Sequence, residues 1–414
     1  MTSMRWGRAG LVVSASALIA AAGSLAAPST DAQAAASVTT GSYSNAAGTR
    51  SYELAVPSSY KPGTPVPLIV ALHGCTETAD QFAKLTRFSE LAEAKGFIVV
   101  YPEQSKSANR MGCWNWFQDA NVKRGTGEPA IIAGITQSIQ QHYSVDPRRI
   151  YVAGLSAGGA MSAVMGATYP DLYAAYGVGS GCEYTAGAAC AGYQSADPEL
   201  AGQRAYQAMG SYARVVPFIA FEGDKDTTVP PINATQLVRA GQVTADWADD
   251  GQANGSVPKA AVKTAGATVS GGRTYTVNRY SEHAGYELAQ YWLVHGMNHA
   301  WSGGDASQQY ADPTGPNESA AMLDFFISHP MPQGSSQKEW PSLTSQAGGD
   351  TPTGTVGQIP PGTGGQSGSG TGSHDLPICR MAPVSGWISP VCSWKPATGV
   401  VWTASSWTGA GSSR

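Results

Sequence analysis

The chain has 414 residues, of which 42% are hydrophobic and only 13% charged, and its formal net charge is −4. A chain of this length and composition can bury a substantial core, so we expect a globular protein rather than a disordered one. The mildly acidic balance includes no basic patch, which argues against nucleic acid or an anionic membrane as the partner.

The first residues have the pattern of a secretory signal. Arg5 and Arg8 precede an apolar run over residues 11–22, and small residues follow it. The run is shorter than the roughly 18 residues that a membrane-spanning helix needs. We therefore predict a signal peptide over residues 1–36 and a secreted, extracellular, monomeric protein without a membrane segment.

Apolar runs of strand length alternate with segments of helical periodicity along residues 37–333. The run 67–72 is continuously apolar, as in a strand that a parallel sheet buries on both faces. The expected strands are 49–56, 67–72, 97–101, 150–155, 173–179, 216–221, 274–280 and 287–294, and the expected helices are 78–95, 130–143, 159–169, 198–209 and 319–328. This alternation predicts an α/β fold in which helices flank an open, mostly parallel sheet.

The composition changes after the predicted α/β domain. Residues 334–373 are dominated by Gly, Ser, Thr, Pro and Gln, which predicts a flexible linker. Residues 374–414 are rich in tryptophan and contain two cysteines, and a segment this small needs a disulfide to fold alone. We predict a small module whose tryptophans either bind a polymer surface or form a minimal core.

The segment 154–158 reads G-x-S-x-G and separates an expected strand from an expected helix. A serine at so tight a turn projects its hydroxyl out of the sheet, and Gly154 and Gly158 let the neighbouring backbones approach. This is how an α/β-hydrolase presents its nucleophile. Ser156 is therefore the candidate nucleophile, although chance alone could place a serine between glycines in a chain with 50 of them.

A serine nucleophile needs a base and an acid that orients the base, and in α/β-hydrolases these follow the serine in the order acid, then histidine. We favour Asp226 over Asp224 as the acid because it lies deeper in the loop after the strand 216–221, and Glu222 is a third alternative. His299 lies in a glycine-rich loop after the strand 287–294. It is therefore favoured as the base over His295, which would end that strand.

The tetrahedral intermediate of ester hydrolysis needs two backbone amides to stabilise its oxyanion. Ala157, directly after the nucleophile, would supply one. The second is expected from the loop after the strand 67–72, from Cys75 or, as alternatives, from Gly74 or Thr76.

Six cysteines in a secreted protein predict disulfides, although the sequence alone does not determine their pairing. Cys182 and Cys190 would close a local loop, Cys379 and Cys392 lie together in the tail, and Cys75 and Cys113 remain. A disulfide between Cys75 and Cys113 would hold the loop that carries the candidate oxyanion donor Cys75. The cysteines lack the spacing of a zinc site, and we expect neither a metal nor another cofactor.

Six segments together resemble the family of extracellular polyhydroxybutyrate depolymerases and feruloyl or acetylxylan esterases, within the α/β-hydrolases. They are LHGCTETADQFA, YPEQ, GCWNWF, DPRRIYVAGLSAGGAMS, GDKDTTVPP and GMNHAWSGG, and they fall between residues 38 and 330. The resemblance implies a catalytic triad of Ser156, Asp226 and His299. It also implies that the amides of Cys75 and Ala157 form the oxyanion hole.

We therefore predict a secreted serine esterase that hydrolyses poly(3-hydroxybutyrate) or its oligomers. The alternatives are a carbohydrate esterase acting on feruloyl or acetyl groups of plant polysaccharide and, from another class, a surface-binding protein without catalysis. The partner would be a polymeric or oligomeric ester. Trp114, Trp116 and Trp301 lie beside the predicted site in the sequence and are candidates to line the substrate cleft.

Overall fold

The computed structural model describes residues 36–192, 197–282 and 285–333, and the backbone of residues 378–384 and 387–393. Residues 1–35 of the predicted signal peptide and the whole predicted linker lie outside the described residues. Contacts divide the chain into two units, 1–350 and 351–414.

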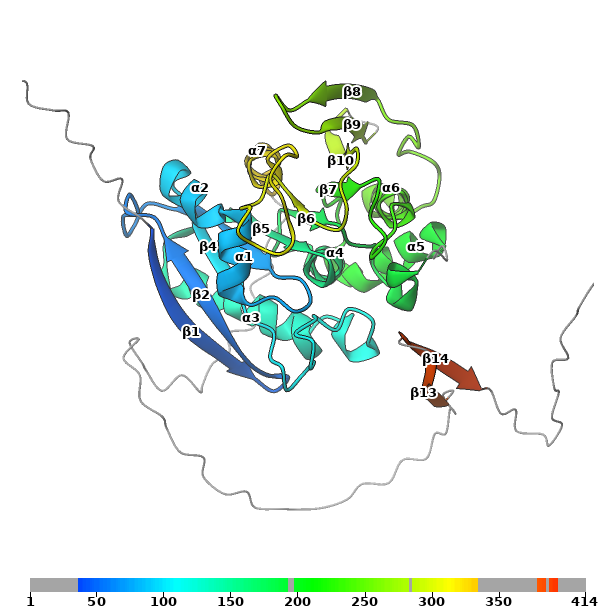
Figure 1. Ribbon diagram of the computed structural model, residues 1–414, viewed down its shortest axis with the longest axis horizontal. Coiled ribbons are helices and arrows are strands. Elements are labelled where there is room, and N and C mark those ends of the chain that lie inside the picture. The colour runs from blue at the N-terminus through cyan, green and yellow to red at the C-terminus, as the bar shows by residue number, and fades with distance from the viewer. Residues whose placement is uncertain (1–35, 193–196, 283–284, 334–377, 385–386, 394–414) are drawn as a thin grey trace, which may run out of the picture. The chain divides into compact units, whose positions relative to one another are not determined.

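A ten-stranded sheet forms the centre of the first unit, in the order β1-β2-β4-β3-β5-β6-β7-β10-β9-β8 (Figure 1). The six strands from β4 to β10 in this order are parallel to one another, whereas β1 and β2 at one edge of the sheet and β9 and β8 at the other are joined by antiparallel pairs. The strands are β1 (Ser37–Asn45), β2 (Gly48–Val56), β3 (Val66–Leu72), β4 (Ile98–Pro102), β5 (Val145–Leu155), β6 (Ala175–Gly179), β7 (Phe218–Gly223), β8 (Lys263–Thr268), β9 (Thr274–Ser281) and β10 (Glu287–Val294). This arrangement confirms the predicted α/β-hydrolase class.

Helices cover both faces of the sheet and create two apolar cores. Alternate residues of β3 show the division, because Leu68, Val70 and Leu72 face a core with α3 to α6, whereas Ile69 and Ala71 face one with α1, α2 and α7. The helices are α1 (Ala79–Thr86), α2 (Phe88–Lys95), α3 (Gly127–His142), α4 (Ala157–Thr168), α5 (Pro198–Met209), α6 (Ile232–Asp250) and α7 (Glu318–Ser328). Shorter elements are η1 (Asp119–Asn121), η2 (Gly187–Ala191), η3 (Gly210–Tyr212), β11 (Trp301–Ser302) and β12 (Ala311–Asp312).

Most expected elements of the α/β domain are present, with three differences. The expected helix 78–95 is two helices, because Arg87 adopts a left-handed conformation with φ of 55° between α1 and α2. The edge strands β1 and β8 and the long helix α6 were not predicted. No helix among the described residues is long and apolar enough to cross a membrane.

The second unit contains a two-stranded antiparallel sheet of β13 (Ile378–Val384) and β14 (Trp387–Ser393). Cys379 and Cys392 are direct partners in its register. Their predicted disulfide and the role of the tail tryptophans stay predictions.

Candidate active site

Ser156 stands at the sharp turn between β5 and α4, at the carboxyl end of the parallel strands. Its backbone has φ of 57° and ψ of −118°, which a residue with a Cβ rarely adopts. Its N–H donates to the carbonyl of Gly179 at 2.8 Å, so the neighbouring strand β6 helps to hold the turn. The strain is that of a nucleophile elbow.

The two glycines of the motif are required by packing. A Cβ on Gly154 would lie 2.5 Å from the carbonyl oxygen of Leu72, and one on Gly158 would overlap the same carbonyl. The backbones of β3, β5 and α4 therefore approach so closely that only glycine fits. This close approach distinguishes the motif from a serine placed between glycines by chance.

Asp226 and His299 lie in the loops after β7 and β10, at the same carboxyl ends of the parallel strands where Ser156 stands. The Nδ1 of His299 lies 2.7 Å from the Oδ2 of Asp226, and their side chains are 12% and 0% exposed. A carboxylate only accepts hydrogen bonds, so Nδ1 is the donor, and in the neutral imidazole the lone pair is therefore on Nε2. The pair therefore has the orientation that a general base requires.

The environment of Asp226 keeps it ionised. Burial raises the pKa of its carboxyl, but the hydrogen bonds from His299 and from the amides of Val229 and Thr228 outweigh this effect and hold the pKa below its ordinary value. An ionised Asp226 can stabilise the imidazolium that forms when His299 takes a proton.

The alternative acid and base pair with each other. The Nδ1 of His295 lies 3.1 Å from Asp224, and its Nε2 lies 2.9 Å from the hydroxyl of Thr276. The hydroxyl, the imidazole and the carboxylate contact one another in the order of a triad. Thr276 lies within the regular strand β9, opposite Leu293 of β10, and not at a strand-to-helix turn. The pair links β7, β9 and β10.

Glu222, the third candidate acid, is fully buried at the end of β7. Burial, and then the nearby charge of Asp226, raise its pKa well above the ordinary range. A carboxyl that stays neutral cannot balance the charge of an imidazolium, so this position does not suit the acid of a triad.

The loop after β3 leaves one amide unengaged. The N–H of Gly74 donates to Oε2 of Glu77 at 2.8 Å, and the N–H of Thr76 donates to the carbonyl of Met111 at 2.7 Å. Among the described residues, no hydrogen bond engages the amide of Cys75 between them. Of the three amides that the sequence left open, Cys75 is thus the one free to bind an oxyanion, and Ala157, the first residue of α4, offers a second.

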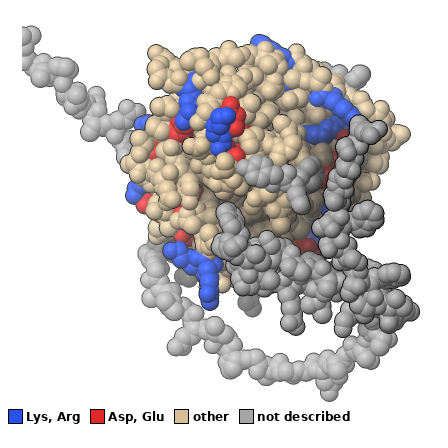
Figure 2. All heavy atoms as spheres, turned by 45° about the vertical axis from the view of Figure 1, so that its right-hand side comes forward, with Lys and Arg blue, Asp and Glu red and all other residues tan. Residues whose placement is uncertain are grey.

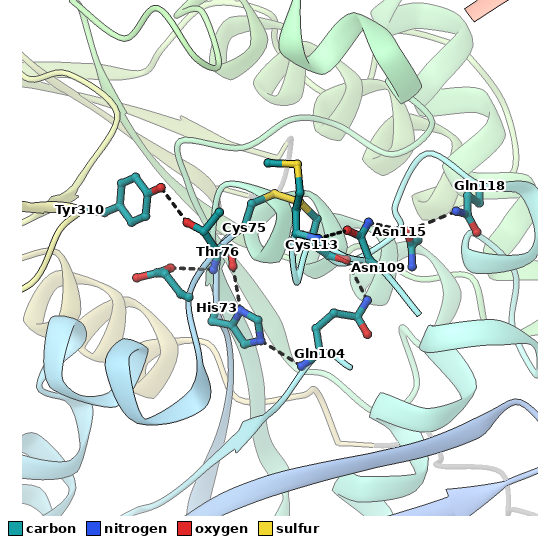
Figure 3. Close-up of a disulfide and its surroundings, with 12 residues drawn as sticks. His73, Cys75, Thr76, Gln104, Asn109, Cys113, Asn115, Gln118 and Tyr310 are labelled. Carbon is teal, nitrogen blue, oxygen red and sulfur yellow. Dashed lines mark hydrogen bonds between the residues drawn. A yellow bond between two sulfur atoms is a disulfide. The ribbon is translucent and has the colours of Figure 1, made fainter. Parts of the chain in front are cut away.

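A disulfide and a buried histidine brace this loop (Figure 3). Cys75 is bonded to Cys113, and the Nε2 of His73 accepts the N–H of Gln104 at 3.0 Å. Burial lowers the pKa of His73 to about 4, so the ring is neutral and can accept that bond. The Cys75–Cys113 and Cys182–Cys190 disulfides were both predicted and both are present.

Residues 50–255 match the family described as Esterase PHB depolymerase. The matched range contains Cys75, Ser156 and Asp226 and ends before His299. This part of the chain belongs to that family.

Named relatives of the esterase family differ in their substrates. The chain is 36% identical over 180 residues to poly(3-hydroxyalkanoate) depolymerase C of Paucimonas lemoignei, across 42% of this chain and 43% of the relative. It is 34% identical over 206 residues to a probable acetylxylan esterase A of Neosartorya fischeri, across 46% and 54%. The chain thus spans about half the length of the curated relatives it matches.

A solved acetyl xylan esterase from Aspergillus awamori has a similar fold. Its structure shares 25% identity with the chain at a TM-score of 0.54, and the match covers 64% of this chain and 94% of that one.

Two of the three tryptophans proposed to line the cleft are core residues. Trp114 and Trp301 are both 0% exposed, and the ring of Trp301 packs edge-on against Phe82 and Phe88. Neither can contact a substrate that enters from solvent, so this expectation was wrong for both. Large aromatic side chains close to an active site in sequence often complete the core beneath it.

Trp116 differs from the two buried tryptophans. It is half-buried against the Cys182–Cys190 disulfide and Ala160 of α4, one turn after Ser156. Its ring meets Phe117 edge-on, and Phe117 is 46% exposed. Trp116 thus remains a candidate for the cleft.

The sequence reasoning missed Glu77 and Tyr310. Glu77 accepts the amide of Gly74. The hydroxyl of Tyr310 lies 2.9 Å from that of Thr76 (Figure 3). The ring of Tyr310 also packs edge-on to His299. Glu77 lies inside the LHGCTETADQFA segment on which the family resemblance rests, whereas Tyr310 lies in none of the six segments.

Proposed function

We propose that the protein is a secreted serine esterase in which Ser156, His299 and Asp226 form the catalytic triad. The observation that carries the proposal is the buried hydrogen bond of 2.7 Å between His299 and Asp226. It lies at the carboxyl ends of the parallel strands, as does the strained turn at Ser156. Secretion is supported by the two disulfides, which form and persist in oxidising compartments.

The reaction proceeds through an acyl-enzyme. The Nε2 of His299 takes the Ser156 proton as the hydroxyl oxygen attacks the ester carbonyl, and Asp226 stabilises the resulting imidazolium. His299 then gives the proton to the leaving alcohol as the ester bond breaks. Water repeats these steps on the acyl-enzyme and releases the acid.

The amides of Cys75 and Ala157 bind the oxyanion of each tetrahedral intermediate. Each such donor contributes on the order of 3 kcal/mol to lowering the barrier. Glu77 and Met111 occupy the amides on either side of Cys75 and so fix the direction in which its N–H points.

The proposed substrate is poly(3-hydroxybutyrate) or its oligomers, and the second candidate is an acetylated or feruloylated polysaccharide. The depolymerase of Paucimonas lemoignei supports the first, and the similarity to acetylxylan esterases in sequence and fold favours the second. Both substrates need the same catalytic residues, so the residues that contact the acyl and alcohol groups decide between them, and Trp116 is the remaining candidate for such a contact.

A panel of substrates tests both statements. Purified protein is assayed on polyhydroxybutyrate granules, 3-hydroxybutyrate oligomers, acetylated xylan and methyl ferulate, beside Ser156→Ala. We expect the polyester substrates to be cleaved fastest and Ser156→Ala to lose several orders of magnitude in turnover. Preference for acetylated xylan or methyl ferulate would establish the carbohydrate esterase. Unchanged hydrolysis by Ser156→Ala, or binding of granules without hydrolysis by the parent, would contradict the proposal.

A further inference from the structure

Thr76, next to the proposed oxyanion donor Cys75, has a strained backbone. Its φ of 66° lies in the left-handed region, which a β-branched residue rarely occupies. Such a conformation costs on the order of 1–3 kcal/mol and persists only where surrounding contacts enforce it. Something must therefore hold this residue in place.

Three contacts hold this part of the loop. The Cys75–Cys113 disulfide and the bond from the Thr76 amide to Met111 both connect it to the segment 111–113. The third contact is the hydrogen bond of 2.9 Å between the hydroxyls of Thr76 and Tyr310, which are 234 positions apart in the chain. Of these three contacts between described residues, only the third joins the loop to the part of the chain that carries His299.

Tyr310 reaches the loop from the segment that follows His299 in the chain. Its carbonyl accepts the N–H of Trp301, two residues after His299, at 2.7 Å, and its ring lies edge-on to that of His299 with centroids 6.2 Å apart. The strands that carry the two loops, β3 and β10, lie on opposite sides of β5 in the sheet. The Tyr310 side chain therefore connects the loop of the base with the loop of the oxyanion donor, as Figure 3 shows for its hydroxyl and Thr76.

We propose that Tyr310 is a positioning residue for ester hydrolysis, which holds Thr76 in its strained conformation and thereby aims the Cys75 amide at the oxyanion. This inference rests on the proposed function. Without the Tyr310 hydroxyl, the loop can relax toward an unstrained backbone. A rotation at Thr76 turns the Cys75–Thr76 peptide unit, and the preceding unit, which carries the Cys75 N–H, shifts with it. The loss falls on the transition state, because the oxyanion forms only there.

A double-mutant cycle tests the contact. Tyr310→Phe removes one hydroxyl and keeps the ring, and Thr76→Val removes the other and keeps the branched Cβ. Turnover is followed on a soluble p-nitrophenyl ester. We expect each variant to lower kcat by about 3- to 10-fold with little change in KM, as for the loss of one hydrogen bond. The double variant should be no slower than the slower single variant, because both changes remove the same contact.

Tyr60→Phe is the matched control. The Tyr60 hydroxyl accepts the amide of Ser144 at 2.9 Å, just before β5 begins and thus at the opposite end of the strand from Ser156. Tyr60→Phe should lower the melting temperature about as much as Tyr310→Phe does and should leave kcat unchanged. A binding readout completes the test: a trifluoromethyl ketone, which forms a tetrahedral adduct with a serine, should bind Tyr310→Phe more weakly in proportion to its loss of kcat.

The failure of this inference can be distinguished from the failure of the proposed function. If Ser156→Ala is inactive but Tyr310→Phe keeps the parent kcat, or if the effects of Tyr310→Phe and Thr76→Val multiply in the double variant, Tyr310 has only a structural role. If Ser156→Ala is as active as the parent, the proposed function itself is wrong.

Discussion

Replacing Glu77 by glutamine should change how the stability of the protein depends on pH. Glu77 is 7% exposed and lies beneath the oxyanion loop, where its Oε2 accepts the Gly74 amide. Burial raises its pKa to about 7 from an ordinary 4.5, although the bond from Gly74 acts in the opposite direction. Glutamine is of similar size and still offers an oxygen to Gly74, but it does not titrate.

The direction in which the free energy of unfolding changes with pH follows from whether the folded or the unfolded chain binds the Glu77 proton. Between pH 4.5 and 7 the unfolded chain has lost the Glu77 proton and the folded chain still binds it, so the free energy of unfolding falls as pH rises. The favourable contribution of the neutral carboxyl is complete below pH 4.5 and lost above pH 7. At about 1.4 kcal/mol per pKa unit, the loss is about 3 kcal/mol.

Urea denaturation of the parent and Glu77→Gln from pH 4.5 to 8 measures this difference. As pH rises from 4.5 to 8, the free energy of unfolding of Glu77→Gln should increase by about 3 kcal/mol relative to that of the parent. Other titrating groups contribute equally to both proteins and cancel in this difference. Glu90→Gln, at a side chain that is 63% exposed, is the control for loss of a surface carboxyl, and its difference in free energy of unfolding from the parent should stay below about 1 kcal/mol. Parallel curves for the parent and Glu77→Gln would refute the reasoning, since they would mean that Glu77 ionises alike in the folded and unfolded chains.

Four further variants test the site. His299→Ala should lower kcat by roughly 10⁴-fold or more, whereas His295→Ala should keep kcat within a few-fold of the parent, and steady-state kinetics that ranked them the other way would reverse their roles. Gly158→Ala should cost at least about 1–3 kcal/mol in urea denaturation and abolish turnover, because its Cβ would overlap the Leu72 carbonyl; an active, stable variant would show that the elbow does not need this glycine. Replacing Cys75 and Cys113 by serine opens a loop with a sequence separation of 38 and should cost up to about 4 kcal/mol and much of kcat, so full activity would show that the disulfide does not position the loop.

The elements with a strong hydrophobic signal could be predicted from sequence. The parallel strands are continuously apolar because both faces are buried, and this identified β3 and the strand before Ser156. Helix α6 gave no such signal, because several of its buried positions are alanine, such as Ala234, or glutamine, such as Gln236. The edge strand β1 is largely exposed and lacks the apolar run of a central strand.

The pairing of Asp226 with His299 could be expected from two features of the sequence. Both residues follow Ser156 in the order acid, then histidine, and each lies a few residues past the end of its strand. The structure places Asp226 with His299 and Asp224 with His295, in agreement with that expectation for the pair itself. Their catalytic roles await experiment. Short motifs were informative here because each candidate site residue lies just after a strand.

Contacts between distant segments could not be predicted in this way. Nothing in the residues around Tyr310 indicates that its hydroxyl meets that of Thr76, because this contact depends on how two loops of the folded chain approach each other. The burial of Trp114 and Trp301 has the same origin, since position beside a motif does not tell whether a side chain points into the core or into solvent.

Covalent labelling tests the central claim most directly. A fluorophosphonate reacts with an activated serine, forming an O–P bond as fluoride leaves, and peptide mass spectrometry then locates the adduct. We predict one adduct, on Ser156, formed at the parent rate in His295→Ala and greatly slowed in His299→Ala. An adduct on another residue, or equally fast labelling of Ser156 in His299→Ala, would contradict the account.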